Sequence, residues 1–321
     1  MNKVLQRRLV PDRGAPRLPR MLLRRIVPVF LLCLTIGARA AEPGQPVATQ
    51  ALHNVFKVDA ALYSGNAPED EAAFRELAKM GIKTIVTVDG TKPNVALAHQ
   101  YGMRYVHLPF GYDGVPQARG EELAKAVQVA EAEGPVYLHC HHGKHRAPSA
   151  AAIVCQALDG WTKEQAIDFL HQAGTAADYS GLYRDVRAFR APTAEALAGM
   201  RTDFPEIAKT TPMVDMMVEI DQRCDALKAA QKAGWREVPG HKDTSPAQAA
   251  VLVWELFREL ARDPETKKRG EEYMTRLAEG EKTAAALRAM LDDPSQPTAV
   301  RDGAFQEMTQ TCTTCHKAHR N

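Results

Sequence analysis

Cysteine, aromatic residues and long apolar runs are all scarce in this sequence of 321 residues. Six cysteines are present, and the five beyond residue 40 are widely scattered, which excludes a framework of disulfides. No internal repeat and no low-complexity tract is found. With 45% hydrophobic and 25% charged residues, the composition is typical of a globular protein, and the length allows two domains with separate cores.

An excess of positive charge is also lacking once the N-terminal segment is set aside. Residues 1–40 hold nine Lys/Arg and one Asp, and without them the formal net charge changes from +2 to −6. A mildly acidic body lacks the basic surface that binds a phosphate backbone. Nucleic acid is therefore not an expected partner.

The first forty residues have the layout of a secretory signal peptide. Two arginines precede an apolar run that ends at Ile36, and Ala-Arg-Ala at 38–40 offers a cleavage site between small residues. About a dozen apolar residues are too few to span a bilayer core of roughly 30 Å comfortably. We therefore expect export to a bacterial periplasm, with no stable membrane span after cleavage. The basic region before the apolar run is unusually long for a signal peptide. Translation therefore begins at either Met1 or Met21, and the sequence leaves both open.

Residues 50–190 alternate between short β-branched runs and amphipathic helices. IKTIVTV at 82–88 and PVYLHC at 135–140 predict buried strands, and PEDEAAFRELAKMG at 68–81 predicts a helix with an acidic first turn and a glycine stop. Strands that alternate with helices indicate an α/β domain, in which a central, mainly parallel sheet is flanked by helices.

Strand signals disappear in the rest of the chain. Residues 191–203 are typical of a linker, and residues 204–321 carry apolar side chains at helical spacings of three and four. The two stripes are Met213, Met217, Ile220, Cys224 and Leu227, and Phe305, Met308, Cys312 and Cys315. Between them, Ser245-Pro246 begins a further helix with a capping serine and a proline at the first helical position. Four amphipathic helices predict an all-α four-helix bundle.

The stretch HCHHGKHR at 139–146 joins a predicted strand to a predicted helix. Such a loop points backbone N–H groups into one concavity, where the helix dipole adds positive potential. A thiolate at Cys140 is stabilised there, and the guanidinium of Arg146 can fork onto two oxygens of an oxyanion. A glycine in the middle permits the tight backbone path. The predicted phosphate-binding residues are His141, His142, Gly143, Lys144, His145 and Arg146.

This segment resembles the HCxxGxxR signature of the cysteine-dependent protein tyrosine and dual-specificity phosphatases, and DGVP from Asp113 resembles their acid loop. The resemblance covers roughly residues 50–190. It implies that Cys140 attacks phosphorus while Arg146 and the loop amides hold the oxygens, with His139 orienting the thiolate. Asp113 would protonate the leaving group and then activate water. No metal is expected for this step.

One position departs from that family's pattern. The family carries Ser or Thr after the arginine, where the hydroxyl helps to discharge the phosphocysteine, and here that residue is Ala147. Ser149 is expected to point elsewhere on the helix, so breakdown of the intermediate should be slow. Two alternatives stay open: a transition-metal site built from His141, His142 and His145, and a phosphate-binding module without turnover.

The chain ends in TQTCTTCHKAHRN, in which Cys312, Cys315 and His316 have the spacing of haem c attachment. Two thiols three apart on a helix can form thioethers to both vinyl groups of one haem, and the adjacent imidazole can bind the iron. A zinc site would need a second pair of ligands, and a thioredoxin-like motif would need strands that this half lacks.

A CxxCH motif at the end of a four-helix domain resembles the class II cytochromes c, the cytochrome c′ and c-556 group, over about residues 204–321. The resemblance implies covalent haem c, with His316 as axial iron ligand and Arg320 beside a propionate. Members that have a sixth ligand take a methionine from the first helix. Met217 on the apolar stripe fits best among Met213, Met216 and Met217, although a stripe methionine is more often packing.

The sequence thus predicts an exported cysteine-dependent phosphatase, fused to a haem c domain for electron transfer, redox sensing or gas binding. The alternative is a non-enzymatic periplasmic c-type cytochrome with an anion-binding, phosphatase-like module. Expected partners are a phosphorylated protein or small molecule, a redox partner, and a second copy of the chain that pairs through the bundle.

Overall fold

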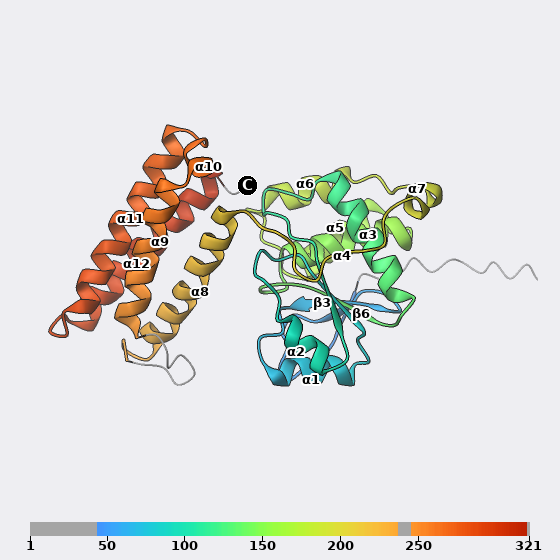
Figure 1. The fold of residues 1–321 in the computed structure, drawn as a ribbon, viewed down its shortest axis with the longest axis horizontal. Helices are drawn as coiled ribbons and strands as arrows, with labels where there is room; N and C mark the ends of the chain where they lie inside the picture. Colours follow the sequence, from blue (N-terminus) through green and yellow to red (C-terminus); the bar gives the residue numbers. More distant parts are fainter. Residues whose placement is uncertain (1–43, 237–244, 320–321) are drawn as a thin grey trace, which may run out of the picture. The chain divides into compact units, whose positions relative to one another are not determined.

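A six-stranded sheet, in the order β1-β2-β3-β6-β4-β5, forms the centre of the N-terminal half (Figure 1). The computed structural model describes residues 44–236 and 245–319, and the signal-peptide prediction for residues 1–40 lies outside them. The strands are β1 (Gln45–Pro46), β2 (Phe56–Lys57), β3 (Leu62–Asn66), β4 (Thr84–Thr87), β5 (Arg104–His107) and β6 (Val136–Cys140).

The sheet is mixed. Strands β3, β6, β4 and β5 run parallel, whereas β1 and β2 continue the sheet antiparallel beyond β3. The antiparallel edge arises because β2 and β3 are joined by a tight turn, in which Asp59 accepts hydrogen bonds from the N–H groups of Ala61 and Leu62. A parallel pair would need a crossover of a dozen or more residues. The expectation of a mainly parallel sheet therefore holds for the centre and is corrected at this edge.

Helices pack on both faces of the sheet. They are α1 (Glu71–Lys79), α2 (Val95–Gln100), α3 (Gln117–Glu131), α4 (Arg146–Leu158), α5 (Lys163–Gln172) and α6 (Ser180–Ala188), and the short helix α7 (Ala194–Ala198) follows them in the chain. The predicted helix at 68–81 is confirmed as α1. Asp70 caps its start by accepting from the N–H of Ala73, and Gly81 follows its end with φ +79°.

Successive residues of the central strands face two separate cores. Val136 and Leu138 of β6 belong to the core shared with α3 to α6, while Tyr137 belongs to the core shared with α1 and α2. In β4, Val86 belongs to the first of these cores and Ile85 to the second. Because both faces are covered, every residue of β4 and of β6 is buried, as the stretch IKTIVTV predicts for β4.

The C-terminal helical region, residues 212–319, has no strand among its described residues. It consists of α8 (Pro212–Lys232), α9 (Pro246–Arg262), α10 (Pro264–Lys267), α11 (Glu271–Asp292) and α12 (Thr298–His319). Helix α9 packs against α8 and α11, and α11 packs against α12. The predicted stripes supply buried core residues, among them Cys224, Leu227, Phe305 and Met308. This arrangement is consistent with a four-helix bundle.

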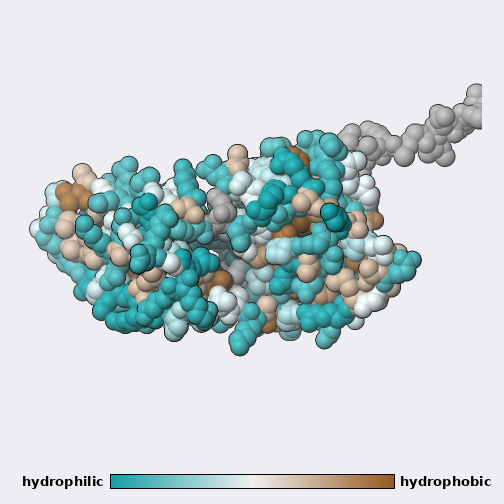
Figure 2. All heavy atoms as spheres, turned by 90° about the horizontal axis from the view of Figure 1, so that it is seen from above, coloured by the Kyte–Doolittle hydropathy of each residue, from teal (hydrophilic) through white to brown (hydrophobic). Residues whose placement is uncertain are grey.

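The surface drawn in Figure 2 is mainly hydrophilic, with small and scattered hydrophobic patches. The exposed large hydrophobic residues among those described are Ile207 and Val300. Within residues 44–236 and 245–319, no helix has both the length and the apolar character needed to cross a bilayer.

Candidate active site

The predicted phosphate loop lies between an inner strand of the parallel group and a helix N-terminus. Cys140 is the last residue of β6, and Arg146 is the first residue of α4. Strand β6 lies between β3 and β4 and is parallel to both. The carboxyl ends of parallel strands meet at one edge, so residues that follow β3 and β4 surround this loop.

The carbonyl groups of the loop are held outward. Four of them accept hydrogen bonds from groups outside the loop, over distances of 2.6–3.2 Å. The pairs are Ala67 N–His141 O, Asn54 Nδ2–Gly143 O, Thr175 Oγ1–Lys144 O, and Ser149 N and Oγ–His145 O. Along residues 141–144, no acceptor for the backbone N–H groups is found within the described chain. Because N–H and C=O point in opposite directions across each peptide, these amides are turned toward the interior of the loop.

Gly143 is required by two features of its surroundings. Its φ is +68°, a left-handed conformation that residues with a side chain rarely adopt. A Cβ at this position would lie 2.4 Å from the carbonyl carbon of Gly65 and 2.5 Å from the backbone nitrogen of Asn66. The loop therefore packs directly on the backbone of β3, and only glycine fits there.

Arg146 is buried, and its guanidinium is held in one orientation. Nη2 donates to Oδ2 of Asp89 at 3.1 Å and to the hydroxyl of Tyr112 at 3.0 Å, and the guanidinium lies 4.2 Å from the centre of the Tyr112 ring. Although burial alone would lower it, the neighbouring Asp89 carboxylate raises the pKa of Arg146 above its ordinary value. Nε is buried with no hydrogen-bond partner among the described residues. A buried donor without a partner costs about 1–3 kcal/mol, and a bound oxyanion would satisfy it.

Asp89 was not among the residues that the motifs indicated. It follows β4, it is 5% exposed, and Thr91 donates to its Oδ1 from both the backbone N–H and the hydroxyl. Burial raises the pKa of Asp89, but the Arg146 guanidinium and the Thr91 amide together bring it below the ordinary value. The sequence feature that could have indicated Asp89 is its position. In the stretch TVDG it lies at the carboxyl end of a predicted buried strand, the edge of a parallel sheet where functional residues gather.

Asp113 lies on the segment that precedes α3, with its side chain exposed. Arg184 of α6 anchors this segment, because its Nη2 donates to the backbone oxygen of Asp113 at 2.9 Å. Gly181 packs against the same peptide, where a Cβ would lie 2.0 Å from that oxygen. The preceding residue, Tyr112, contacts Arg146. The acid loop therefore lies against the phosphate loop.

Aromatic rings line the site next to Arg146, and sequence reasoning missed them. The ring centres of Tyr112 and Tyr179 are 4.8 Å apart, and those of Tyr179 and His145 are 4.3 Å apart. Tyr179 comes from the turn before α6, which follows the phosphate loop by more than thirty residues in the sequence. Only the fold brings these rings together.

The histidines of the motif do not form a metal site in the described residues. His141 and His142 stack on each other at 4.1 Å, while His145 packs on Tyr179. Among the described residues, the group whose ligand atoms come within 4.8 Å of one another is Asp59, Cys155 and Asp159, remote from the motif in sequence. The structure thus gives no geometric support to the metal alternative.

Cys140 and Ala147, the residue that follows Arg146, are both buried in the apolar core of the domain. Cys140 is 1% exposed, and Ala147 is fully buried in the same core. Ser149 donates its hydroxyl to the carbonyl of His145, so it does not replace the missing Ser or Thr. Both ring nitrogens of His139 lack a hydrogen-bond partner among the described residues, and burial lowers the pKa of this imidazole. The described residues therefore show no side-chain hydrogen bond through which His139 would orient the thiolate.

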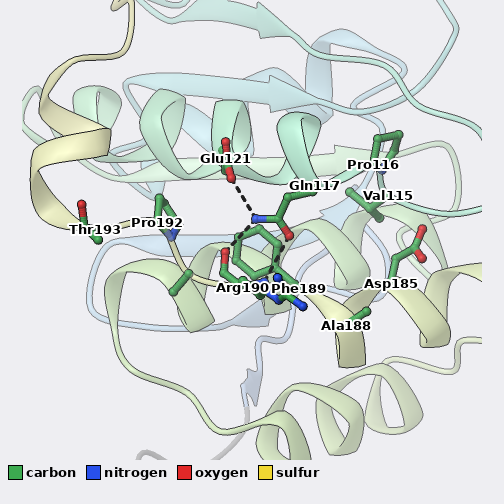
Figure 3. Close-up of a pocket in the computed structure, with 11 residues that line it drawn as sticks. Val115, Pro116, Gln117, Glu121, Asp185, Ala188, Phe189, Arg190, Pro192 and Thr193 are labelled. Carbon is green, nitrogen blue, oxygen red and sulfur yellow. Dashed lines mark hydrogen bonds between the residues drawn. The ribbon is translucent and has the colours of Figure 1, made fainter.

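A separate cavity of about 630 Å³ adjoins the acid loop (Figure 3). Its wall includes Val115 and Pro116, which follow Asp113 closely in sequence. Gln117 spans it, donating to the Arg190 carbonyl at 2.7 Å and to Glu121 at 2.9 Å. Neither Cys140 nor Arg146 lines this cavity.

The residues predicted to hold haem lie near the end of α12. Cys312 and Cys315 are free and partly buried, and His316 follows in the same helix. The start of α11 lies beside both α8 and α12 here, because Tyr273 donates to Sδ of Met213 at 3.6 Å and its ring lies 5.2 Å from that of His319. Met217 packs partly buried on the helical core, and Arg320 lies outside the described residues.

These residues fit a haem chemically. Two thiols one helical turn apart, an imidazole and nearby thioethers are the ligand types that haem c uses. Nε2 of His319 is also buried without a hydrogen-bond partner among the described residues, which leaves a polar group at this end to be satisfied.

A thiol at the end of a central strand, an amide-lined loop and a buried arginine at a helix start together define a cysteine-dependent phosphatase. Comparison with known proteins agrees. The family model described as "Swiss Army Knife protein, DSP-PTPase phosphatase domain" (PTP-SAK) matches residues 55–197. The dual specificity protein phosphatase TpbA of Pseudomonas aeruginosa (strain UCBPP-PA14) is 30% identical over 159 residues, which cover 48% of this chain and 72% of TpbA. The chain belongs to this family of dual-specificity protein phosphatases and is a phosphatase.

Two solved structures are among those similar to this chain. The crystal structure of P. aeruginosa TpbA is 26% identical with a TM-score of 0.42, and the match covers 50% of this chain and 96% of that one. The core catalytic domain of the PP-IP phosphatase SIW14 from S. cerevisiae, in complex with citrate, is 15% identical with a TM-score of 0.40, covering 44% and 89%.

Proposed function

We propose that the chain hydrolyses phosphate monoesters, phosphoproteins among them, through a phosphocysteine at Cys140. The observation that carries this proposal is the loop from Cys140 to Arg146. Its carbonyl groups are held outward, its amides at 141–144 have no acceptor within the described residues, and Arg146 keeps a buried, unpaired N–H. These are donors aimed at a tetrahedral oxyanion next to a thiol.

The reaction has two displacements. Sγ of Cys140 attacks phosphorus and the bond from phosphorus to the leaving oxygen breaks, while Asp113 transfers its proton to that oxygen. Water then attacks the phosphocysteine, the S–P bond breaks, and Asp113 takes up the proton from water. Because Ala147 and Ser149 place no hydroxyl at the sulfur, the second displacement is the slower one.

An aryl phosphate is the favoured ester. The rings of Tyr112, Tyr179 and His145 form an aromatic wall beside Arg146, on which the ring of a phosphotyrosine can pack. TpbA is named a dual specificity protein phosphatase, which supports a phosphoprotein as substrate.

The test compares the wild-type chain with Cys140→Ser on a generic aryl phosphate. We expect turnover by the wild type and a loss of at least about 10³-fold in the variant, because a serine hydroxyl is a far weaker nucleophile than a cysteine thiolate. Cys155→Ala is the matched control, since Cys155 is a fully buried thiol in α4 that packs in the same core. Absence of turnover by folded wild-type protein would overturn the proposal.

We further propose that the C-terminal helical region carries covalent haem c through Cys312 and Cys315, with His316 on the iron and Met217 as the candidate sixth ligand. The clustering of Met213, Tyr273 and His319 at the same end supports this placement. Bound haem would supply electron transfer, redox sensing or gas binding. A redox partner and a homodimer through this region stay predictions, as does the proposed contact of Arg320 with a propionate.

The haem proposal has a test independent of phosphatase turnover. When the chain is produced with haem c maturation, the Soret band should stay with the denatured polypeptide and should be lost in a Cys312→Ser, Cys315→Ser double variant. Cys224→Ala, which removes a neighbouring core thiol, should keep the band. Extraction of the chromophore by acidified acetone would contradict covalent attachment. Since haem c is attached outside the cytoplasm, the proposal also requires the export that the first forty residues predict.

A further inference from the structure

Residues 204–208, here called the edge segment, belong structurally to the phosphatase half. The segment follows α7 and leads into α8, and it lies beyond residues 55–197 that match the family model (Figure 1). Phe204 is buried in the core under α3 to α6. Strand β5 is the last strand of the sheet on this side, and the edge segment accepts hydrogen bonds from two of its N–H groups. Tyr105 N donates to Oε1 of Glu206 at 3.1 Å, and His107 N donates to the Pro205 carbonyl at 2.8 Å.

The side chain of His107 connects this segment to the residue that holds Arg146. His107 is fully buried; its Nδ1 accepts from the N–H of Ala208 at 3.0 Å, and its Nε2 lies 2.7 Å from the backbone oxygen of Asp89. An amide N–H can only donate, so Nδ1 is unprotonated and Nε2 carries the proton that Asp89 accepts. Burial lowers the pKa of His107, which is consistent with this neutral tautomer.

Asp89 is therefore held at two points. Its backbone oxygen is bound by His107, and Oδ1 of its carboxylate is bound by Thr91. The remaining carboxylate oxygen, Oδ2, receives Nη2 of Arg146 at 3.1 Å. A continuous series of hydrogen bonds thus runs from Ala208 through His107 and Asp89 to the arginine of the phosphate loop.

We propose that His107 is a positioning residue, through which the edge segment fixes the orientation of the Arg146 guanidinium for oxyanion binding. The inference rests on the proposed function, since it assigns Arg146 to the oxyanion. Among the described residues, the hydrogen bonds of the His107 ring go to Asp89 and Ala208 and not to the loop amides or Cys140. His107 acts by fixing the backbone of Asp89, because a carboxylate displaced by a fraction of an ångström would turn the guanidinium that it pairs with. The phosphatase unit consequently extends to residue 208, and the chain that joins it to α8 contributes to its site.

The test uses two alkylating reagents on the full chain. Iodoacetate and iodoacetamide react at the same carbon, with Sγ of Cys140 forming the S–C bond and iodide leaving. Only iodoacetate carries a carboxylate that Arg146 can bind, so the ratio of the two rates at Cys140, followed by peptide mass spectrometry, reports guanidinium orientation. We expect His107→Phe to lower this ratio about 10-fold and to raise KM for an aryl phosphate, since misplacement by 1 Å can cost up to about 10²-fold.

Two further variants separate positioning from stability. His107→Gln places an acceptor and a donor on one side chain and should restore the ratio to within about threefold of wild type. Val106→Ala opens a cavity at the neighbouring, fully buried residue of β5 without touching the series of hydrogen bonds, and should lower Tm but leave the ratio unchanged. A wild-type ratio in His107→Phe, or an equal loss in Val106→Ala, would overturn the inference.

A milder variant covers the case in which His107→Phe does not fold. Ala208→Pro removes the N–H that Nδ1 accepts, and Lys209→Pro is its control, because Lys209 N donates no hydrogen bond within the described residues. We expect a lower ratio in the first variant only, and equal ratios in both would contradict the inference. The alkylation ratio is measured without phosphate turnover, so failure of the proposed function would show separately, as a wild-type chain that does not hydrolyse the aryl phosphate.

Discussion

Replacing Gly143 with alanine perturbs the phosphate loop at the point where it packs on β3. The new Cβ would lie 2.4 Å from the carbonyl carbon of Gly65, about 1 Å inside ordinary contact distance, and the obstacle is backbone that cannot rotate away. A left-handed φ of +68° adds about 1–2 kcal/mol of strain for a residue with a Cβ. The loop must therefore move by several tenths of an ångström or more, and its amides move with it.

We expect Gly143→Ala to lose about 10²-fold in kcat/KM for an aryl phosphate, because displacement of oxyanion donors by 1 Å costs about that much. Gly81→Ala is the matched control. Its φ of +79° brings the same strain, but nothing lies within 4 Å of the added Cβ. This control should lose about 1–2 kcal/mol of unfolding free energy and keep its activity. Gly143→Ala with activity within about threefold of wild type would refute the reasoning about the loop.

Three further predictions follow from individual side chains. Ala147→Ser should speed the breakdown of phosphocysteine and raise kcat, measured as a smaller pre-steady-state burst relative to the steady rate. Asp113→Asn should lower kcat by about 10²-fold or more for phenyl phosphate but less for an aryl ester with a better leaving group, and an equal loss for both would contradict its role as acid. Burial and the carboxylates of Asp59 and Asp159 raise the pKa of Glu131 to about 7. Because this folded pKa lies above the unfolded value, stability is lost as pH rises from about 5 through 7, so Glu131→Gln should raise Tm relative to wild type at pH 8 and not at pH 5.

The local features of this fold can be predicted from the sequence because each depends on residues that are close together in the chain. The caps at Asp70 and Ser245 and the helix end before Gly81 depend on hydrogen bonds between residues within about four positions of each other, so the local sequence indicates them. The order of strand, glycine loop and helix around Cys140 is local in the same sense. The motif therefore predicts the loop and its placement in the fold without reference to any long-range contact.

The remaining parts of the site depend on contacts between distant segments. Asp89 and Arg146 are hydrogen-bonded although they lie 57 positions apart in the sequence. Ala208 of the edge segment and His107 are hydrogen-bonded across a separation of 101 positions. No periodicity or spacing marks such pairs, because each is created by strand order in the sheet. The antiparallel edge was missed for a related reason, since the residues of β2 and β3 favour strands whichever direction they pair.

The linker prediction illustrates the same limit. Residues 191–203 have the composition of a connector, yet α7 (Ala194–Ala198) forms within them, and the chain beyond them covers the edge of β5. An edge strand with free N–H groups is a liability that proteins cover. Which segment covers it depends on where the chain runs after α6, and composition does not contain that information.

The central claim is that Cys140 carries the phosphoryl group during turnover. Rapid acid quenching of the wild-type chain with an aryl phosphate, followed by peptide mass spectrometry, tests it most directly. The account predicts one phosphoryl group on the peptide that contains Cys140, at a level that Ala147→Ser reduces and Cys140→Ser abolishes. Steady turnover with no phosphoryl group on Cys140, or with the group on another residue, would contradict it.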